Sequence, residues 1–125
     1  MIGITQYLQA VYEDLQTYVD NDVCLCKLKE LNFEAGALPD YEDINIQRLY
    51  LLRYSFAYAF EYSRMYLNVL SKMDDVNSIS VTSVGCGSMI DYWALVHALE
   101  MKSKIDCNIR YVGIDEIDWN YKIPQ

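Results

Sequence analysis

The stretch Val81-Thr-Ser-Val-Gly-Cys-Gly-Ser88 decides the fold of this chain, because strand-like residues lead directly into two closely spaced glycines. Residues 79–84 have the alternating, β-branched character of a strand. Glycines that follow a strand allow a sharp turn and let a ligand approach the backbone closely. Ser88 followed by Asp91 resembles a capping box at the start of a helix. We therefore predict a strand, a tight turn and a helix, in this order.

A second strand is predicted for residues 109–115, which end in Gly113-Ile-Asp115. The strand–helix–strand order predicts a βαβ unit with two parallel strands. The start of the helix would direct its free N–H groups toward the space beside the glycines. A carboxylate at Asp115 can accept hydrogen bonds from both hydroxyls of a ribose. The glycine turn and the acidic strand end together predict a nucleoside pocket. On the connecting helix, the residues expected to share one buried face are Ile90, Ala94, His97, Ala98 and Met101.

These segments resemble the first two motifs of class I S-adenosylmethionine (SAM) methyltransferases. The stretch from Val81 to Ser88 is similar to their glycine-rich motif, and Tyr111-Val-Gly-Ile-Asp115 is similar to the motif whose aspartate holds the ribose of SAM. The resemblance covers residues 78–119, about a third of the chain. It implies an α/β fold, in which N-terminal helices precede a partial Rossmann-like βαβ unit with a small parallel sheet. The residues it implies for cofactor binding are Gly85, Cys86 and Gly87 beside the methionine part of SAM, Asp115 on the ribose, and Glu116 or Ile117 near the adenine.

Three features depart from the pattern of that family. Ser83 stands where an acidic residue is usual, two places before the first glycine, and Met89 stands where a third glycine is common. The interval from Gly85 to Asp115 is also longer than the roughly 20 residues expected of such units. A long crossover helix and loop would account for the additional residues. Asp91 is a candidate replacement for the missing acid.

The N-terminal part of the chain is predicted to be helical. Residues 4–19 have apolar side chains at helical spacing, and residues 41–73 fit one long helix. Residues 23–31 fit either a short helix or an irregular packed segment. We expect residues 1–125 to form a single domain, with a helical region at 1–77 and the methyltransferase-like unit at 78–125. The core stripe expected on the long helix comprises Leu49, Leu52, Phe56, Ala59, Phe60, Ser63, Leu67 and Leu70.

A row of tyrosines runs beside this stripe, at every fourth position from Tyr50 to Tyr66. Four residues turn a helix by about 400°, so the row drifts by about 40° per step and its two ends need not face the same partner. Tyrosine favours half-buried positions, where the ring packs and the hydroxyl finds a hydrogen bond. Two interpretations remain open, namely packing within the fold and a protein-binding surface.

The composition limits the classes of function. The chain has 10 basic and 18 acidic residues and a net charge of −8, which disfavours direct binding to a nucleic-acid backbone and suits a basic protein surface. No apolar run is long enough to cross a membrane, and we expect a cytoplasmic protein with reduced thiols. Cys24 and Cys26 form a C-x-C, but no second close pair accompanies them, and His97 lies far along the chain. We therefore expect no metal site and read the cysteines as small buried hydrophobes.

The sheet is expected to need a partner. In the full methyltransferase fold the first strand is paired on both edges, whereas here residues 79–84 can pair only with residues 109–115. The other edge would present unpaired N–H and C=O groups, and a two-stranded sheet is hard to sustain. The N-terminal helices can cover the faces of the sheet but not readily its edge. We expect another protein or a second copy of the chain to complete it.

Two functions follow as hypotheses. The first is a truncated, methyltransferase-like and non-catalytic protein that acts through an acidic, tyrosine-rich surface. An inhibitor of a nucleic-acid-binding enzyme, of the anti-CRISPR kind, would fit this size and charge. The second is the SAM-binding half of a methyltransferase that becomes active only when a partner chain completes it. An NAD site is less well matched, because Ile90 stands at the third glycine position of the NAD motif, and a βαβ unit without a ligand is the remaining alternative.

Overall fold

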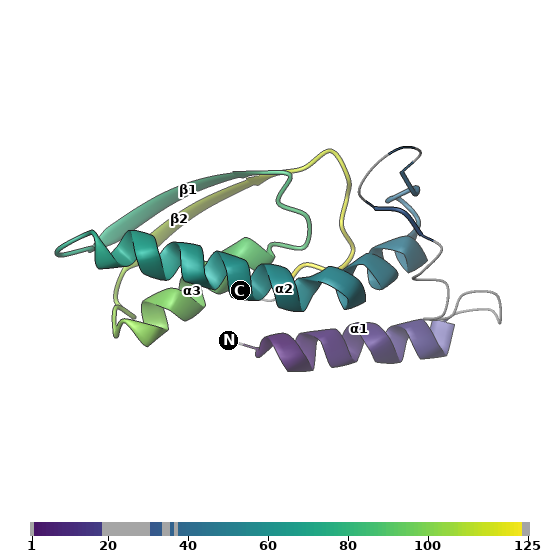
Figure 1. The fold of residues 1–125 in the computed structure, drawn as a ribbon, viewed down its shortest axis with the longest axis horizontal. Helices are drawn as coiled ribbons and strands as arrows, with labels where there is room; N and C mark the ends of the chain where they lie inside the picture. The colour runs from purple at the N-terminus through teal and green to yellow at the C-terminus, as the bar shows by residue number, and fades with distance from the viewer. Residues whose placement is uncertain (1, 19–30, 34–35, 37, 124–125) are drawn as a thin grey trace.

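The computed structural model of the chain describes residues 2–18, 31–33, 36 and 38–123 (Figure 1). The predicted α/β class is confirmed, because two N-terminal helices precede a strand–helix–strand unit. The segment 23–31, predicted as a short helix or an irregular packed segment, lies outside the described residues except for Leu31, and Cys24 and Cys26 lie outside them as well. In chain order the elements are α1 (Ile4–Tyr18), α2 (Ile44–Ser71), β1 (Ser78–Val84), α3 (Ile90–Met101) and β2 (Asn108–Ile114).

The two strands form a parallel sheet, as the βαβ pattern predicts. They pair in register from Ser78 opposite Asn108 to Val84 opposite Ile114. Helices α2 and α3 lie together on one side of this sheet (Figure 1). Within the described part of the chain, the helices therefore cover one face of the sheet. On the other face the apolar side chains of Val84, Val112 and Ile114 remain exposed, at 81%, 44% and 52% of their surface.

The buried side chains form two clusters. The smaller one joins α2, α3 and the covered face of the sheet, and Leu95 at its centre has no exposed surface. The larger one joins all three helices to the segment that follows β2, in which Trp119 and Ile123 are buried. The Ile123 N–H donates to the Ser88 carbonyl at 2.9 Å. The residues after β2 therefore return to the glycine turn and become part of the core.

The predicted capping box at the start of α3 is wrong. The helix begins at Ile90, and its N-cap residue is Met89, which has a left-handed backbone with φ 65° and makes no side-chain capping bond. Ser88 lies one position earlier and is buried, with its carbonyl bonded to the returning C-terminal segment. Asp91 instead accepts a hydrogen bond from the Tyr111 hydroxyl at 2.9 Å. Tertiary contacts thus outweigh the local capping preference.

The predicted buried faces are only partly correct. On α2, Leu49, Ala59 and Leu70 are buried as expected, but Phe56 and Phe60 are 55% and 64% exposed. The buried positions that the stripe missed are Gln47, Arg48, Leu51 and Ser55. On α3, Met101 is 60% exposed, His97 is half-buried against the Trp93 ring, and the buried residues include Leu95 and Leu99. Both helices are therefore rotated from the orientation that the sequence pattern indicated.

Candidate functional site

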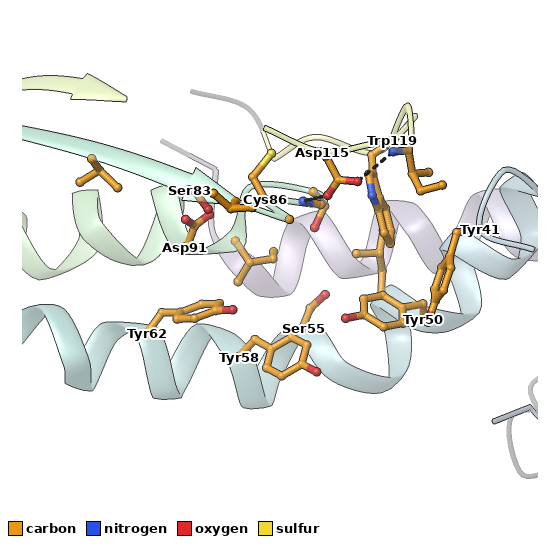
Figure 2. Close-up of a pocket in the computed structure, with 18 of the residues that line it drawn as sticks. Tyr41, Tyr50, Ser55, Tyr58, Tyr62, Ser83, Cys86, Asp91, Asp115 and Trp119 are labelled. Atoms are coloured by element: carbon orange, nitrogen blue, oxygen red, sulfur yellow. Dashed lines mark hydrogen bonds between the residues drawn. The ribbon is translucent and has the colours of Figure 1, made fainter. Parts of the chain in front are cut away.

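A cavity of about 540 Å³ opens at the carboxyl ends of the two strands, between the glycine turn and α2 (Figure 2). All five residues that the sequence singled out for cofactor binding line it, namely Gly85, Cys86, Gly87, Asp115 and Glu116. Ser83 and Asp91 also line it, so the missing acid position and its candidate replacement share the same space. The cavity lies where parallel α/β sheets bind their ligands, beyond the carboxyl ends of the strands.

The glycine turn is held against the end of β2. The N–H groups of Gly85 and Cys86 both donate to the Ile114 carbonyl, at 2.6 and 3.3 Å. Gly85 and Gly87 have φ values of 70° and 51°. Residues other than glycine rarely adopt this backbone conformation. A Cβ atom on Gly113 would lie 2.8 Å from the Cys86 sulfur, so the absence of a side chain there makes room for the thiol. These glycines give the turn its shape.

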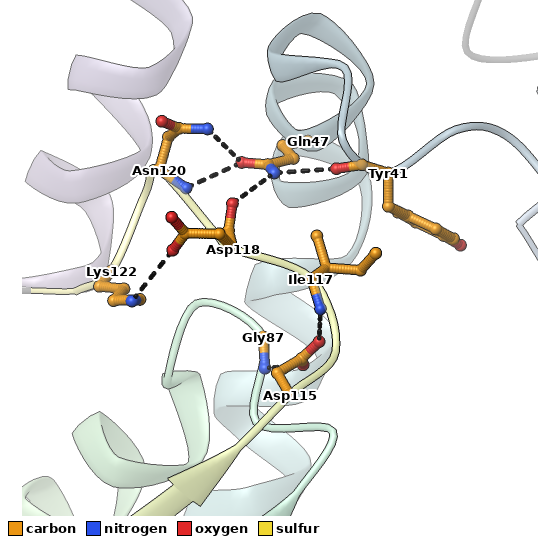
Figure 3. Close-up of polar contacts among 8 residues, drawn as sticks. All are labelled: Tyr41, Gln47, Gly87, Asp115, Ile117, Asp118, Asn120 and Lys122. Atoms are coloured by element: carbon orange, nitrogen blue, oxygen red, sulfur yellow. Dashed lines mark hydrogen bonds and ion pairs between the residues drawn. The ribbon is translucent and has the colours of Figure 1, made fainter.

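Asp115 joins the glycine turn to the segment after β2. Its Oδ2 accepts a hydrogen bond from Gly87 N at 2.7 Å, and its Oδ1 accepts one from Ile117 N at 2.9 Å (Figure 3). Asp115, which was expected to bind a ribose, therefore stabilises the glycine turn through hydrogen bonds to the backbone. Each carboxylate oxygen has a second acceptor position, so Asp115 can still receive two hydroxyl groups.

A buried amide anchors the other end of this segment. Gln47 is fully buried, and its Nε2 donates to the carbonyls of Tyr41 at 2.8 Å and Asp118 at 3.2 Å (Figure 3). Its Oε1 accepts a hydrogen bond from Asn120 N at 3.0 Å. These bonds tie the start of α2 to the residues after Asp115, so the two walls of the cavity are joined directly.

The tyrosine row forms the wall opposite the glycine turn. Tyr50, Tyr58, Tyr62 and Tyr66 line the cavity, and all are half-buried. Burial, together with the charge of Asp91, raises the pKa of Tyr66 to about 12, and burial also raises the pKa of Tyr50 and Tyr62 above the ordinary value. These phenols are therefore neutral at physiological pH. Four of the five tyrosines of the row thus line this cavity.

The two ends of the row have different neighbours, as its drift around the helix predicts. Tyr50 meets Phe33 at 5.3 Å and Trp119 at 5.5 Å between ring centroids. Tyr66, at the other end, packs against both core clusters. The row thus begins in an aromatic cluster and ends beside the sheet.

Trp119 is a lining residue that the sequence analysis did not identify. It is 7% exposed and packs against Tyr50, Tyr41 and the backbone of Gly87. Its indole nitrogen is buried and has no hydrogen-bond acceptor among the described residues. Figure 2 shows the indole beside Asp115. No pattern in the sequence connects Trp119 with the cavity, because only the return of the chain after β2 brings it there.

Among the residues that the structure describes, the cavity wall contains three carboxylates, those of Asp91, Asp115 and Glu116, and no lysine, arginine or histidine. Within residues 2–18, 31–33, 36 and 38–123, no group of three or more His, Cys, Asp or Glu side chains is placed to hold a metal ion. In the same part of the chain no helix is long and apolar enough to cross a membrane.

Comparisons of this chain with protein-family models, with curated proteins and with solved structures found no match.

Proposed function

We propose that this protein binds a nucleoside-bearing small molecule of the SAM class in the cavity, and that it serves as the cofactor-binding half of a methyltransferase. One observation carries the proposal. Residues of two separate motifs, the glycine turn and Asp115 with Glu116, line a single cavity together with a wall of tyrosines. Such convergence of polar groups in an aromatic cavity is typical of small-molecule sites.

The size and lining of the cavity support this ligand class. A volume of about 540 Å³ lies within the range of roughly 300–1,000 Å³ that is usual for cofactor sites. The half-buried Tyr50 ring lines the cavity and offers a flat apolar surface on which an adenine can stack. Asp115 lies at the strand end, where its free acceptor positions suit the two hydroxyls of a ribose.

The charge of the lining distinguishes SAM from other nucleoside cofactors. NAD and nucleotides carry phosphates, which need cationic or N–H partners and are repelled by carboxylates. The described part of the lining has three carboxylates and no basic side chain, which is unfavourable for such ligands. SAM carries a sulfonium and an ammonium group and no phosphate. Methyl transfer would further require an acceptor site supplied by a partner chain, because a cofactor without a positioned acceptor cannot react efficiently.

The test is a calorimetric titration of the purified chain with SAM, S-adenosylhomocysteine and NAD. We expect micromolar binding of the two adenosyl compounds and no heat with NAD. Binding of NAD in preference to SAM, or no binding of either adenosyl compound at millimolar concentration, would contradict the proposal.

A second candidate function, non-catalytic protein binding, is favoured by the uncovered face of the sheet. Val84, Val112 and Ile114 form an apolar patch there, and among the elements that the structure describes β1 and β2 pair only with each other. Exposed sheet edges readily pair with another chain. We propose that a second protein chain covers this face, whether a second copy or a basic protein that the net charge of −8 attracts, such as a nucleic-acid enzyme inhibited by this chain.

Light scattering measures the mass of the particle and therefore shows whether a second chain is bound. We expect the purified protein to form a particle larger than one chain, and we expect Val112→Lys, which adds a charge to the patch, to reduce it to a monomer. A wild-type protein that remains a well-folded monomer at high concentration and binds no partner would refute the second candidate. The nucleoside titration is independent of this result.

A further inference from the structure

An apolar groove of about 370 Å³ lies on the side of α2 and α3 that faces away from the sheet. On α3, Leu95 and Leu99 belong to the cluster that joins this helix to the sheet, whereas Trp93 and His97 line the groove. Positions two residues apart lie about 200° apart around a helix, so the two pairs are on opposite sides of α3. The groove shares no lining residue with the cavity at the glycine turn. It is therefore a separate candidate site.

Part of the apolar stripe that the sequence predicted as core on α2 lines this groove. Phe56 and Phe60 lie in it and are 55% and 64% exposed. Met101, on α3, also lines the groove and is 60% exposed. Large apolar side chains that gather in one exposed groove, and are not scattered singly over the surface, indicate a binding site. The groove therefore offers apolar surface that a ligand can remove from water.

Contacts within the fold hold the lining side chains in place. Trp93 Nε1 donates to the Ile2 carbonyl at 3.0 Å, which keeps the start of α1 against α3. Ile4, the first residue of α1, lines the groove as a result. The His97 ring stacks on the Trp93 ring, with 4.9 Å between the ring centroids. The groove is thus formed before any ligand binds, as small-molecule sites usually are.

The ionisable groups of the groove are basic. Among the described residues that line it these groups are Arg64 and His97, with no aspartate or glutamate, although the whole chain has a net charge of −8. The Arg64 guanidinium lies over the Phe60 ring, 5.7 Å from its centroid, and the salt bridges among the described residues do not involve it. A guanidinium binds a carboxylate through two parallel hydrogen bonds. The groove is therefore complementary to an apolar compound that carries a carboxylate.

The size of the groove favours a small molecule over a protein. Ten of the described residues line it, whereas one side of a stable protein interface involves roughly 20–30 residues. Its volume lies within the range of roughly 300–1,000 Å³ that is usual for small-molecule sites, which are mostly apolar with a few polar groups.

We infer that this groove binds a small monocarboxylic acid with an apolar tail, of the medium-chain fatty acid class. Arg64 contacts the carboxylate, and the exposed rings of Phe56 and Phe60 cover the tail. The inference does not depend on the proposed nucleoside binding, because the two sites have no residue in common.

Calorimetric titration with octanoate and with 1-octanol, which have tails of the same length and differ in charge, tests the carboxylate contact. We expect the wild type to bind octanoate with a submillimolar dissociation constant and to prefer it over 1-octanol by about tenfold, because only octanoate forms a charge-assisted contact. In Arg64→Gln this preference should largely disappear, while 1-octanol binds as before. Arg110→Gln, which removes one exposed positive charge from β2, should leave the preference unchanged.

Phe56→Ala tests the contact with the tail. It should weaken the binding of both compounds by about fivefold, since apolar surface is lost from the groove. Val69→Ala is the matched control, because Val69 is also an exposed apolar residue of α2 and lies outside the groove. It should bind both compounds as the wild type does.

Three outcomes would overturn the inference. The first is a wild type that binds neither compound at millimolar concentration, and the second is a preference for octanoate that Arg64→Gln retains. The third is a dimer in light scattering that Phe56→Ala converts to a monomer, because a second copy of the chain would then occupy the groove.

Discussion

Asp115→Ala is expected to abolish measurable binding of SAM and to loosen the glycine turn. The carboxylate holds Gly87 N at 2.7 Å and Ile117 N at 2.9 Å, and its remaining acceptor positions are those proposed for the ribose. Each hydrogen bond from the ribose to a charged acceptor contributes about 1.5–3 kcal/mol. The loss of two should therefore weaken binding by about a hundredfold or more, since about 1.4 kcal/mol corresponds to tenfold. Calorimetry measures the affinity.

Two further variants separate the role of Asp115 in the turn from its role in binding. Asp115→Asn keeps one acceptor oxygen, so it should retain part of the order of the turn and still lose most of the affinity. Asp118→Ala is the matched control, because that side chain is 99% exposed and makes one ion pair with Lys122 at 3.6 Å. It should bind as the wild type does. Equal affinities of Asp115→Ala and Asp118→Ala would contradict the assigned role.

Leu95→Ala is expected to lower the free energy of unfolding by about 2–5 kcal/mol, the largest stability effect that we predict. Leu95, on α3, has no exposed surface and lies in the cluster that joins α3 to α2 and to the covered face of the sheet. Removing most of its side chain leaves a cavity where these three elements meet, and the surrounding side chains cannot all move in to fill it. Urea denaturation followed by circular dichroism measures the change.

Met101→Ala is the informative comparison, because the sequence pattern and the structure disagree about it. The pattern of Ile90, Ala94 and Ala98 placed Met101 on the buried face of the helix, whereas it is 60% exposed. We therefore expect Met101→Ala to change stability by about 0.5 kcal/mol or less. A loss as large as that of Leu95→Ala would show that α3 is rotated toward the orientation that the pattern predicted.

The sequence predicted the strand–helix–strand unit and the approximate ends of its elements. The alternation in residues 79–84, the paired glycines and the breaker residues are local properties, and local backbone preferences act on them directly. The parallel pairing followed from the order of the elements alone. The chemistry expected at the strand ends also placed Gly85, Gly87 and Asp115 near one another, because parallel strands end at the same edge of a sheet.

The sequence predicted only part of the cavity lining. The tyrosine spacing predicted a row that winds around α2, but it left open whether the row faces a partner protein or the interior. No sequence pattern identified Trp119, which lines the cavity, or Gln47, which connects its two walls by hydrogen bonds. Their positions depend on the return of the chain after β2, which no local preference specifies.

By itself, the sequence determined which segments are helix or strand and which chemistry lies at the glycine turn, since neighbours along the chain control both. The tertiary structure alone decided which face of each helix is buried and what the tyrosines surround. A helical repeat of 3.6 residues leaves the rotation of a helix open by tens of degrees when apolar side chains occur on several faces. Because α2 packs against α3 and the sheet, Leu51 and Leu95 are core residues, whereas Phe56 and Met101 are exposed. In the same orientation of α2, the tyrosine row lines the cavity.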